Sequence, residues 1–422
     1  MVPSAIATLS KTGLLVENRR QDFDSPVLFV LPVVQSFMQQ HGRIGEEIRQ
    51  NIQLSCSQYV LDHYYQNRDS NVKALAAEDV NIQAILCGTH TLQHSNMSIE
   101  ALISFSWYRC NNAKPNLEVT KHAVSMAKAF GDKRFIASSL WCLGNTCGVL
   151  GDFYAAYHHL QEAYQIYNAL LPGDRELQLL CCQCGVAMVN GALSTFEDGD
   201  KVVSLARDVE KQAASVSDDY THVTSLVMLG SVLHNYGHRQ EALHYLERAR
   251  QMGISTLSSE VYFWIAYVHY QEKRLPEALD AAEEAWKLSD LRNNLVTQAQ
   301  VSFLLGRILF NVNRDTEAWN YMEISLTKNL ELGNRRSGAR TLEYMGYGYL
   351  RRGDYLNAYG AYEAAAESYL GTADEEPDGT KCKDNMAKIK DMQKNPDLNV
   401  GFERSRSDVD WPSLFYPGAA SV

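Results

Sequence analysis

One spacing of residues recurs along the chain and limits its fold more than any other feature. In the clearest copy, Leu140-x2-Leu143-Gly144-x2-Cys147 is followed by Ala156-x3-Leu160-x2-Ala163. The small residue at the centre of each copy marks its place: Gly144, Gly185, Gly230, Ala266, Gly306 and Gly346, separated by 41, 45, 36, 40 and 40 residues. A looser, earlier copy covers Leu102 to Ala127. Such self-similarity indicates one small structural unit stacked many times.

Each copy predicts two antiparallel helices. Large residues at positions i, i+3 and i+7 give the first helix an apolar face, and the glycine in that face lets a second helix cross closely. We expect the small alanine of the second helix, such as Ala156, to fit this notch. Between the helices, Gly151-Asp152, Gly237-His238 and Gly353-Asp354 predict a left-handed turn followed by a new helix start.

This pattern resembles the tetratricopeptide repeat (TPR), W-x2-L-G-x2-Y followed by A-x3-F, although the steps exceed the usual length of about 34 residues. It is similar to the longer-period branch found in kinesin light chains, LGN-type adaptors and the C-terminal arrays of signalling NTPases. The resemblance covers residues 92–370 and implies an all-α fold, a TPR-like α-solenoid built as a superhelix of antiparallel helix pairs. It also implies that the concave face binds a protein or peptide.

The N-terminal residues 1–45 follow a different pattern. Two short apolar segments, Gly13 to Glu17 and Pro26 to Leu31, flank a polar turn and predict a β-hairpin, after which Pro32 can open a helix through Gln40. Residues 46–91 are expected to form a helical linker into the array.

A second resemblance covers this N-terminal region. The stretches SPVLFVLPVVQSFMQQH, YVLDHYYQ and ALAAEDVNIQAIL are similar to the junction in fungal NLR-like STAND proteins where a winged-helix wing, following an NB-ARC or NACHT ATPase, leads into TPRs. The residues that carry it are Ser25, Pro26, Leu28, Pro32, Tyr64, Tyr65, Glu78, Asn81 and Ile82. The resemblance implies that residues 1–45 are a winged-helix-like remnant and that the chain is the sensing half of such a protein, with the ATPase domain in cis or in trans.

The C-terminal residues divide into two parts. Residues 371–395 predict a capping helix, since Cys382, Met386, Ile389 and Met392 keep helical spacing. Residues 396–422 are expected to form a flexible tail. Its apolar residues Trp411, Leu414, Phe415 and Tyr416 favour docking on the last repeat, with binding of a partner as the alternative.

Composition excludes several classes of function. The net charge of −11 argues against nucleic-acid binding, which needs a surplus of cations facing phosphate. No run of about 18 apolar residues and no signal peptide are present in the sequence, which predicts a cytoplasmic protein without a membrane partner. The nine cysteines lie mostly in apolar helical patterns and are expected to be buried thiols.

No constellation of residues indicates catalysis, a cofactor or a metal. His234-x3-His238 has the spacing of two metal ligands but lacks the glutamate of H-E-x-x-H. Cys181, Cys182 and Cys184 lack the separated second ligand pair of a zinc site. No G-x-x-x-x-G-K-[ST] phosphate loop occurs.

Binding is therefore the expected function, and the resemblance places it on first-helix residues beside the signature positions. These are aromatic, cationic and amide side chains: Trp141, Asn145, His234, Asn235, Phe263, Tyr267, Tyr270, Phe303, Arg307, Phe310, Arg340, Tyr347 and Arg351. Aromatic and arginine side chains are common interface anchors, and the cations predict an acidic, apolar ligand. A stand-alone TPR adaptor or co-chaperone is the alternative, although the Lys/Asn/Lys/Arg carboxylate clamp of that family is not reproduced.

Overall fold

The computed structural model describes residues 15–18, 27–30, 46–65, 69–88, 95–111, 115–150, 152–170, 174–195, 198–291, 295–370 and 375–394. Its strands are β1 (Leu15–Asn18) and β2 (Val27–Val30). Its N-terminal helices are α3 (Glu46–Tyr65), α4 (Asp69–Leu86), α5 (Asn96–Asn111), α6 (Leu117–Phe130), α7 (Lys133–Val149), α8 (Phe153–Leu170), α9 (Arg175–Thr195) and α10 (Gly199–Ser215). They are followed by α11 (Asp219–Asn235), α12 (Arg239–Met252), α13 (Ser258–Gln271), α14 (Leu275–Leu291), α15 (Leu295–Asn311), α16 (Asp315–Glu331), α17 (Arg335–Arg351), α18 (Tyr355–Tyr369) and α19 (Glu375–Lys394).

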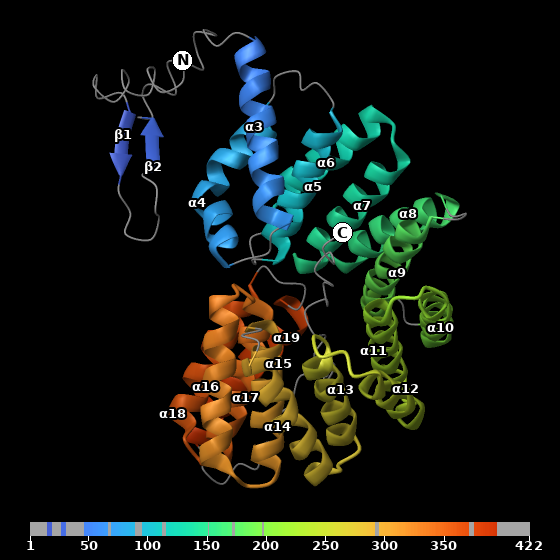
Figure 1. Ribbon diagram of the computed structural model, residues 1–422. Helices are drawn as coiled ribbons and strands as arrows, with labels where there is room; N and C mark the ends of the chain where they lie inside the picture. The colour runs from blue at the N-terminus through green and yellow to red at the C-terminus, as the bar shows by residue number, and fades with distance from the viewer. Residues whose placement is uncertain are drawn as a thin grey trace.

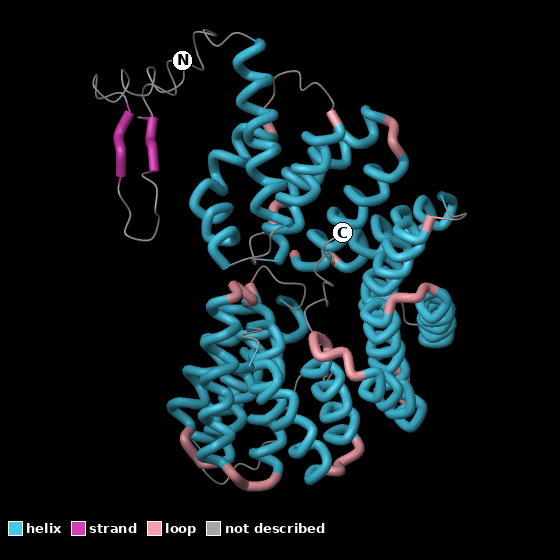
Figure 2. The backbone as a smooth tube through the Cα atoms, viewed as in Figure 1, coloured by secondary structure: helices cyan, strands magenta, loops and turns pink. Residues whose placement is uncertain are grey.

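Consecutive helices form antiparallel pairs joined by short loops (Figure 2). Each predicted copy of the repeat is one pair, from α5/α6 through α17/α18, and the predicted TPR-like α-solenoid is confirmed. Before the array, α3 and α4 form a further pair, and α3 packs directly on α5. After it, α19 packs on α18 and buries Cys382 and Ile389.

The first helix of each pair lies on the inside of the curve. Consecutive first helices contact each other, α5 on α7, α7 on α9, α9 on α11, α11 on α13 and α13 on α15, and each second helix is wedged between two of them. The array bends so that α3–α8 and α14–α19 form two ends joined through α9–α13 (Figure 1). The bend brings α17 back to α8, where the Arg336 guanidinium carbon lies 5.3 Å from the centre of the Phe153 ring.

The joints between the two helices of a pair have one geometry. Gly237 and Gly353 adopt left-handed φ angles of 86° and 71°. In the same turn the next amide bonds back to the helix, with His238 N–H donating to the Leu233 carbonyl at 2.8 Å. The predicted helix–helix turn is confirmed at these two joints, whereas Gly151 lies outside the described residues.

Two joints use this geometry without glycine. Lys273 and Asn313 have φ angles of 61° and 60°, and the following amides of Arg274 and Arg314 donate to carbonyls five residues earlier, at 3.0 and 2.9 Å. A search for Gly-Asp could not find these turns, because a lysine and an asparagine hold the left-handed position.

The glycine notch exists, but a different residue fills it. A Cβ atom on Gly144 would lie 2.6 Å from the Leu160 side chain, and one on Gly230 would lie 2.7 Å from the Leu246 side chain. The notch therefore receives the large residue four positions after the alanine of the second helix, and the expectation that the alanine itself fills it is wrong. At Ala156 the backbone of the second helix itself comes close to the first helix, because the Ala156 carbonyl oxygen would lie 3.0 Å from a Cβ atom on Gly144.

The N-terminal strands pair antiparallel, with Leu15 opposite Val30 and Asn18 opposite Val27, which confirms the predicted hairpin. The helix predicted from Pro32 to Gln40 and the tail 396–422 lie outside the described residues.

Among the described helices, α9 contains the one window that is long and apolar enough to be a candidate membrane span. Its window Arg175–Leu193 has a mean hydropathy of 1.2, enough by length and composition to cross a membrane, and 67% of that window is buried inside the protein. Cys181 and Cys184 are fully buried there. The hydropathy of α9 is accounted for by its place in the core of the solenoid.

The notch predicts opposite effects for two glycine-to-alanine changes. Gly144→Ala should lower the free energy of unfolding by about 1–3 kcal/mol, because its Cβ collides with Leu160 at a close crossing. Gly360→Ala should raise it by about 0.5–1 kcal/mol, because Gly360 is an exposed helical residue with nothing within 4 Å of an added Cβ. Urea unfolding followed by circular dichroism measures both, and an equal shift for the two variants would contradict the notch.

Candidate functional site

The inner layer encloses a cavity of about 40 Å³ between three consecutive first helices, α13, α15 and α17. That volume is sufficient for a few water molecules or the tip of an apolar side chain. The lining residues come from these helices and from the end of α16 with its following loop: Phe263, Tyr267, Val296, Ala299, Gln300, Phe303, Leu304, Arg307, Asn329, Leu332, Asn334, Ser337, Arg340 and Thr341.

Five residues predicted from the sequence meet at this cavity. They are two residues of α13, two of α15 and one of α17: Phe263, Tyr267, Phe303, Arg307 and Arg340. The spacing of the repeat explains the convergence, since Phe263 and Phe303 precede their signature positions by three residues, and Tyr267 and Arg307 follow them by one. Equivalent positions on stacked repeats lie side by side.

A cage of aromatic rings holds one of the two cations at this cavity. The Arg307 guanidinium carbon lies 4.9 Å from the centre of the Tyr270 ring on α13, 5.0 Å from that of Tyr344 on α17 and 5.6 Å from that of Phe303. Arg307 is only 4% exposed, so attraction to three ring faces offsets part of the cost of removing the charge from water. The cage also locks α13, α15 and α17 together across the inner layer.

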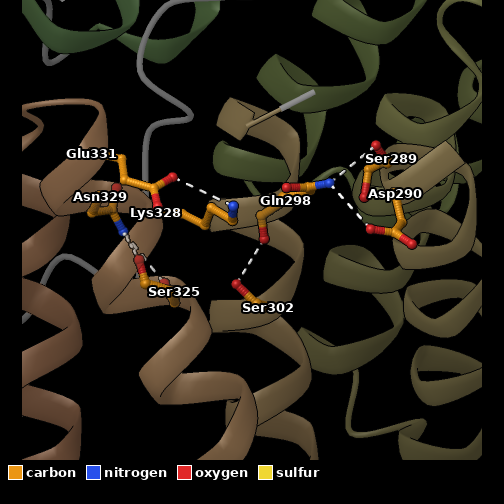
Figure 3. A network of polar contacts seen from close by, with 8 residues as sticks. All are labelled: Ser289, Asp290, Gln298, Ser302, Ser325, Lys328, Asn329 and Glu331. Carbon is orange, nitrogen blue, oxygen red and sulfur yellow. Dashed lines mark hydrogen bonds and ion pairs between the residues drawn. The ribbon is translucent and has the colours of Figure 1, made fainter. Parts of the chain in front are cut away.

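A polar network positions the opposite wall. Ser325 Oγ donates to the Ala299 carbonyl at 2.9 Å and lies 3.3 Å from Thr341 Oγ1, while Asn329 Nδ2 donates to the Ser325 carbonyl at 2.9 Å. Figure 3 shows the Asn329 side chain directed at Ser325. The cavity-lining residues Ala299, Asn329 and Thr341 are thus joined through one buried serine, Ser325.

The same network extends along the start of α15 (Figure 3). Gln298 Nε2 donates to the Ser289 carbonyl and to Asp290 Oδ1, both at 3.4 Å, and Ser302 Oγ donates to the Gln298 carbonyl at 2.7 Å. These bonds tie the start of α15 to the end of α14. Satisfied buried polar groups hold one arrangement of the helices, so the cavity is preformed.

The charged side chains that line the cavity are all positive. Arg307 and Arg340 are its charged residues, and no aspartate or glutamate lines the cavity in the part of the chain that the structure describes. In a chain with a net charge of −11, this is a local inversion of sign. The rim is formed by Val296, which is 38% exposed, and the half-buried Gln300.

The other predicted residues lie elsewhere. Trp141 is 3% exposed and packs edge-on against Trp107, with ring centroids 5.2 Å apart. Asn145 is also buried, and Phe310 packs edge-on against Trp319. These three side chains do not line the cavity, although they are about as buried as Phe263 and Tyr267, which do.

Four further predicted residues are partly accessible but do not line the cavity. Tyr270, Tyr347 and Asn235 are half-buried, and the Tyr270 hydroxyl accepts a hydrogen bond from Asn311 Nδ2 at 3.0 Å. Arg351 is exposed and donates to the Phe310 carbonyl at 2.9 Å and to Asn313 Oδ1 at 3.2 Å. Arg351 therefore lies at the joint end of α17, away from the cavity-lining Arg340.

The cavity also uses residues that sequence reasoning missed. Val296, Ala299 and Gln300 lie in the first turns of α15, and Asn329, Leu332 and Asn334 lie where α16 passes into α17. The predicted set includes the position six residues before the central glycine in the last copy, Arg340. The same position before Gly306 holds Gln300, and the positions seven and ten residues before Gly306 hold Ala299 and Val296.

The three clustered cysteines lie in the packed interior of the solenoid. Cys181, Cys182 and Cys184 are buried, and burial raises the pKa of the Cys181 thiol to about 12. Within the described residues, no group of three His, Cys, Asp or Glu side chains is arranged to hold a metal ion.

Comparisons with known proteins extend the fold assignment. No protein-family model and no curated protein matches the sequence. Among solved structures, the apo form of the quorum sensor NprR from B. thuringiensis is 14% identical, with 80% of this chain and 92% of that chain covered and a TM-score of 0.55. The apo form of RapI is 10% identical, with 65% and 98% covered and a TM-score of 0.50.

A STAND protein with a tetratricopeptide repeat sensor from Pyrococcus horikoshii is also among the similar structures. It is 14% identical, with 92% of this chain and 60% of that chain covered, and its TM-score of 0.39 is too low to assign this chain to that architecture. Together the comparisons show the fold alone, a TPR-like helical solenoid.

Burial of His234, one of the predicted residues, should make the free energy of unfolding depend on pH. His234 is 6% exposed and packs edge-on against the Tyr267 ring, and burial, reinforced by nearby Arg239, lowers its pKa from 6.5 to about 4. Below pH 6.5 the unfolded chain binds a proton that the folded chain does not, so stability is complete above pH 6.5 and falls as the pH drops toward 4. Between pH 7 and pH 5 the loss from this group should be about 2 kcal/mol.

Replacing the histidine isolates this contribution. His234→Gln should unfold in urea with a smaller loss of stability between pH 7 and pH 5 than the unmodified chain. The exposed His238→Gln is the control and should leave the pH dependence unchanged. A His234→Gln variant with the full pH dependence would show that His234 is not buried in its neutral form.

Proposed function

We propose that the chain is a protein–protein interaction scaffold that binds a segment of a peptide or protein ligand on the concave face of the solenoid, over the cavity between α13, α15 and α17. One observation carries the proposal: three consecutive repeats contribute side chains to a single preformed cavity. A ligand that lies across the repeats contacts all three helices at once. The tip of its anchoring side chain enters the cavity that Phe263, Tyr267 and Phe303 line.

The chemistry of the lining selects the ligand. Aromatic and aliphatic side chains form most of the wall, which favours an apolar anchor. Arg307 and Arg340 are the charged residues of the lining, and their positive charge favours acidic groups over basic ones beside the anchor. We therefore infer a ligand that is both acidic and apolar.

The wider role follows from the N-terminal resemblance. The likeness of Ser25 to Ile82 to the junction of fungal NLR-like STAND proteins supports a place as the sensor half of a cytoplasmic signalling protein, acting with an NB-ARC or NACHT ATPase domain in cis or in trans. A stand-alone TPR adaptor or co-chaperone is the second candidate. No nucleic-acid, membrane or catalytic role is part of the proposal.

Two pools of fluorescent nonapeptides test the ligand chemistry. Both pools carry Leu, Phe, Tyr and Trp at the same degenerate positions, and they differ in having Asp and Glu or Lys and Arg elsewhere. In fluorescence anisotropy the acidic pool should bind the full chain at least about tenfold more tightly than the basic pool, as expected for an interface that discriminates by like-charge repulsion. Equal binding of both pools, or binding of neither, would contradict the proposal.

A single rim position then locates the binding. Val296→Glu should weaken binding of the acidic pool about tenfold by placing a carboxylate beside the cavity, whereas Val296→Lys should preserve or strengthen it. Because Val296 is 38% exposed, both variants should melt within a few degrees of the unmodified chain, and each controls for the other. Identical affinities for the two variants would place the ligand elsewhere on the surface.

A further inference from the structure

Two thiols from consecutive repeats meet in the interior of the array. Cys110 lies in the last turn of α5 and Cys142 in the middle of α7, and these two helices contact each other directly. The two thiols are in hydrogen-bond contact. Both are free cysteines, with Cys110 5% and Cys142 0% exposed. Neither lines the cavity between α13, α15 and α17, so the pair is a separate feature of the molecule.

We propose that Cys110 and Cys142 are a site of reversible oxidation, at which hydrogen peroxide closes a disulfide bond between α5 and α7. The inference does not depend on the ligand cavity. It adds a covalent state of the chain in which the first helices of two consecutive repeats are joined to each other.

Two hydroxyl groups complete the surroundings of the thiols. Cys110 Sγ lies 3.1 Å from Thr146 Oγ1, and Thr146 follows Cys142 by one turn of α7. Ser106, one turn before Cys110 on α5, is in hydrogen-bond contact with the Cys142 thiol. All four side chains are buried. One turn of α5 thus faces one turn of α7, and the sulfur atoms start from direct contact, as a disulfide between two helices requires.

Cys110 differs from the other thiols in its acidity. A hydrogen bond from Cys142 lowers the pKa of the Cys110 thiol from its ordinary value of 9.0 by more than burial raises it, and Thr146 and Arg109 act in the same direction as Cys142. Burial raises the pKa of each of the other eight cysteines, to about 11 at Cys147 for example. Because the thiolate is the reactive form, Cys110 is the cysteine that reacts first.

The proposed reaction consumes one hydrogen peroxide and forms one disulfide. The Cys110 thiolate attacks the O–O bond, which breaks to give a sulfenic acid on Cys110 and a hydroxide that takes up a proton and leaves as water. The Cys142 sulfur then displaces the hydroxyl group from the Cys110 sulfur, and a second water leaves with the Cys142 proton. The two thiols together lose two electrons and two protons, and the peroxide is reduced to two waters. A thiol reductant reverses the step by exchange.

The position of Cys110 allows a small oxidant to reach it. Hydrogen peroxide is close to water in size, and the last turn of a helix opens more readily than its middle. Cys142 lies in the middle of α7 and is fully enclosed. The acidic thiol is therefore also the more accessible one, and the enclosed thiol is the one that completes the disulfide. A reactive thiol beside a second, resolving thiol is the usual arrangement of a redox-sensitive cysteine pair.

Mapping of the oxidised cysteines in the folded chain tests the inference. The full chain is treated with an equimolar amount of hydrogen peroxide, the remaining thiols are blocked with N-ethylmaleimide in denaturant, and the chain is digested without reduction for mass spectrometry. The main oxidised product should be two peptides joined through Cys110 and Cys142, which dithiothreitol separates. The clustered Cys181, Cys182 and Cys184 should carry N-ethylmaleimide. Free Cys110 and Cys142 after the treatment, or a disulfide from Cys110 to another cysteine, would overturn the inference.

Substitution of the second cysteine separates the two steps. Cys142→Ser keeps a hydrogen-bond donor beside Cys110 but cannot form the disulfide, so labelling of the Cys110 sulfenic acid by dimedone should rise at least about fivefold over the unmodified chain. Cys147→Ser is the matched control on the same helix, 6% exposed in the native chain, and should leave the yield of the disulfide unchanged. Equal dimedone labelling of the folded Cys142→Ser variant and the unmodified chain would contradict the role of Cys142. If Cys142→Ser fails to fold, the mapping of the unmodified chain still decides.

Discussion

The close crossing of the two helices in each repeat is the contact on which the rest of the structure depends. At Gly144 and Gly230 the absence of a Cβ leaves room for Leu160 and Leu246, which would otherwise lie within 2.7 Å of it. At Gly306 and Gly346 the same space takes Met322 and Tyr362. A constant crossing makes each pair the same wedge, and stacked wedges produce a curved array with its first helices inside.

Within that curve, α13, α15 and α17 are held together by two different kinds of contact. Arg307 lies between aromatic rings from all three helices, and Ser325 links backbone and side chains of α15, α16 and α17. Buried charged and polar groups stabilise a structure only when their partners are in place, so these contacts select one arrangement of the repeats. The cavity is the space that this arrangement leaves open between the three helices.

Aromatic and arginine residues serve the array in two ways that look alike in the sequence. Trp141 and Phe310 satisfy the spacing rule for the inner face, yet they pack edge-on against Trp107 and Trp319 in the core. Phe303 satisfies the same rule and lines the cavity. Phe303 also packs edge-on against a ring, that of Tyr344, but it stays half-buried, whereas Trp141 and Phe310 are fully enclosed.

The repeat spacing by itself determined the fold class, the helix pairs and the joints at Gly237 and Gly353, because local periodicity and backbone preference are properties of short segments. It also determined five residues of the cavity, since equivalent positions of stacked repeats converge. Only the tertiary structure decided which anchors are buried, which residue fills the glycine notch and how the start of α15 and the end of α16 complete the cavity. Those outcomes depend on the sizes of side chains brought together from different helices, which no single segment specifies.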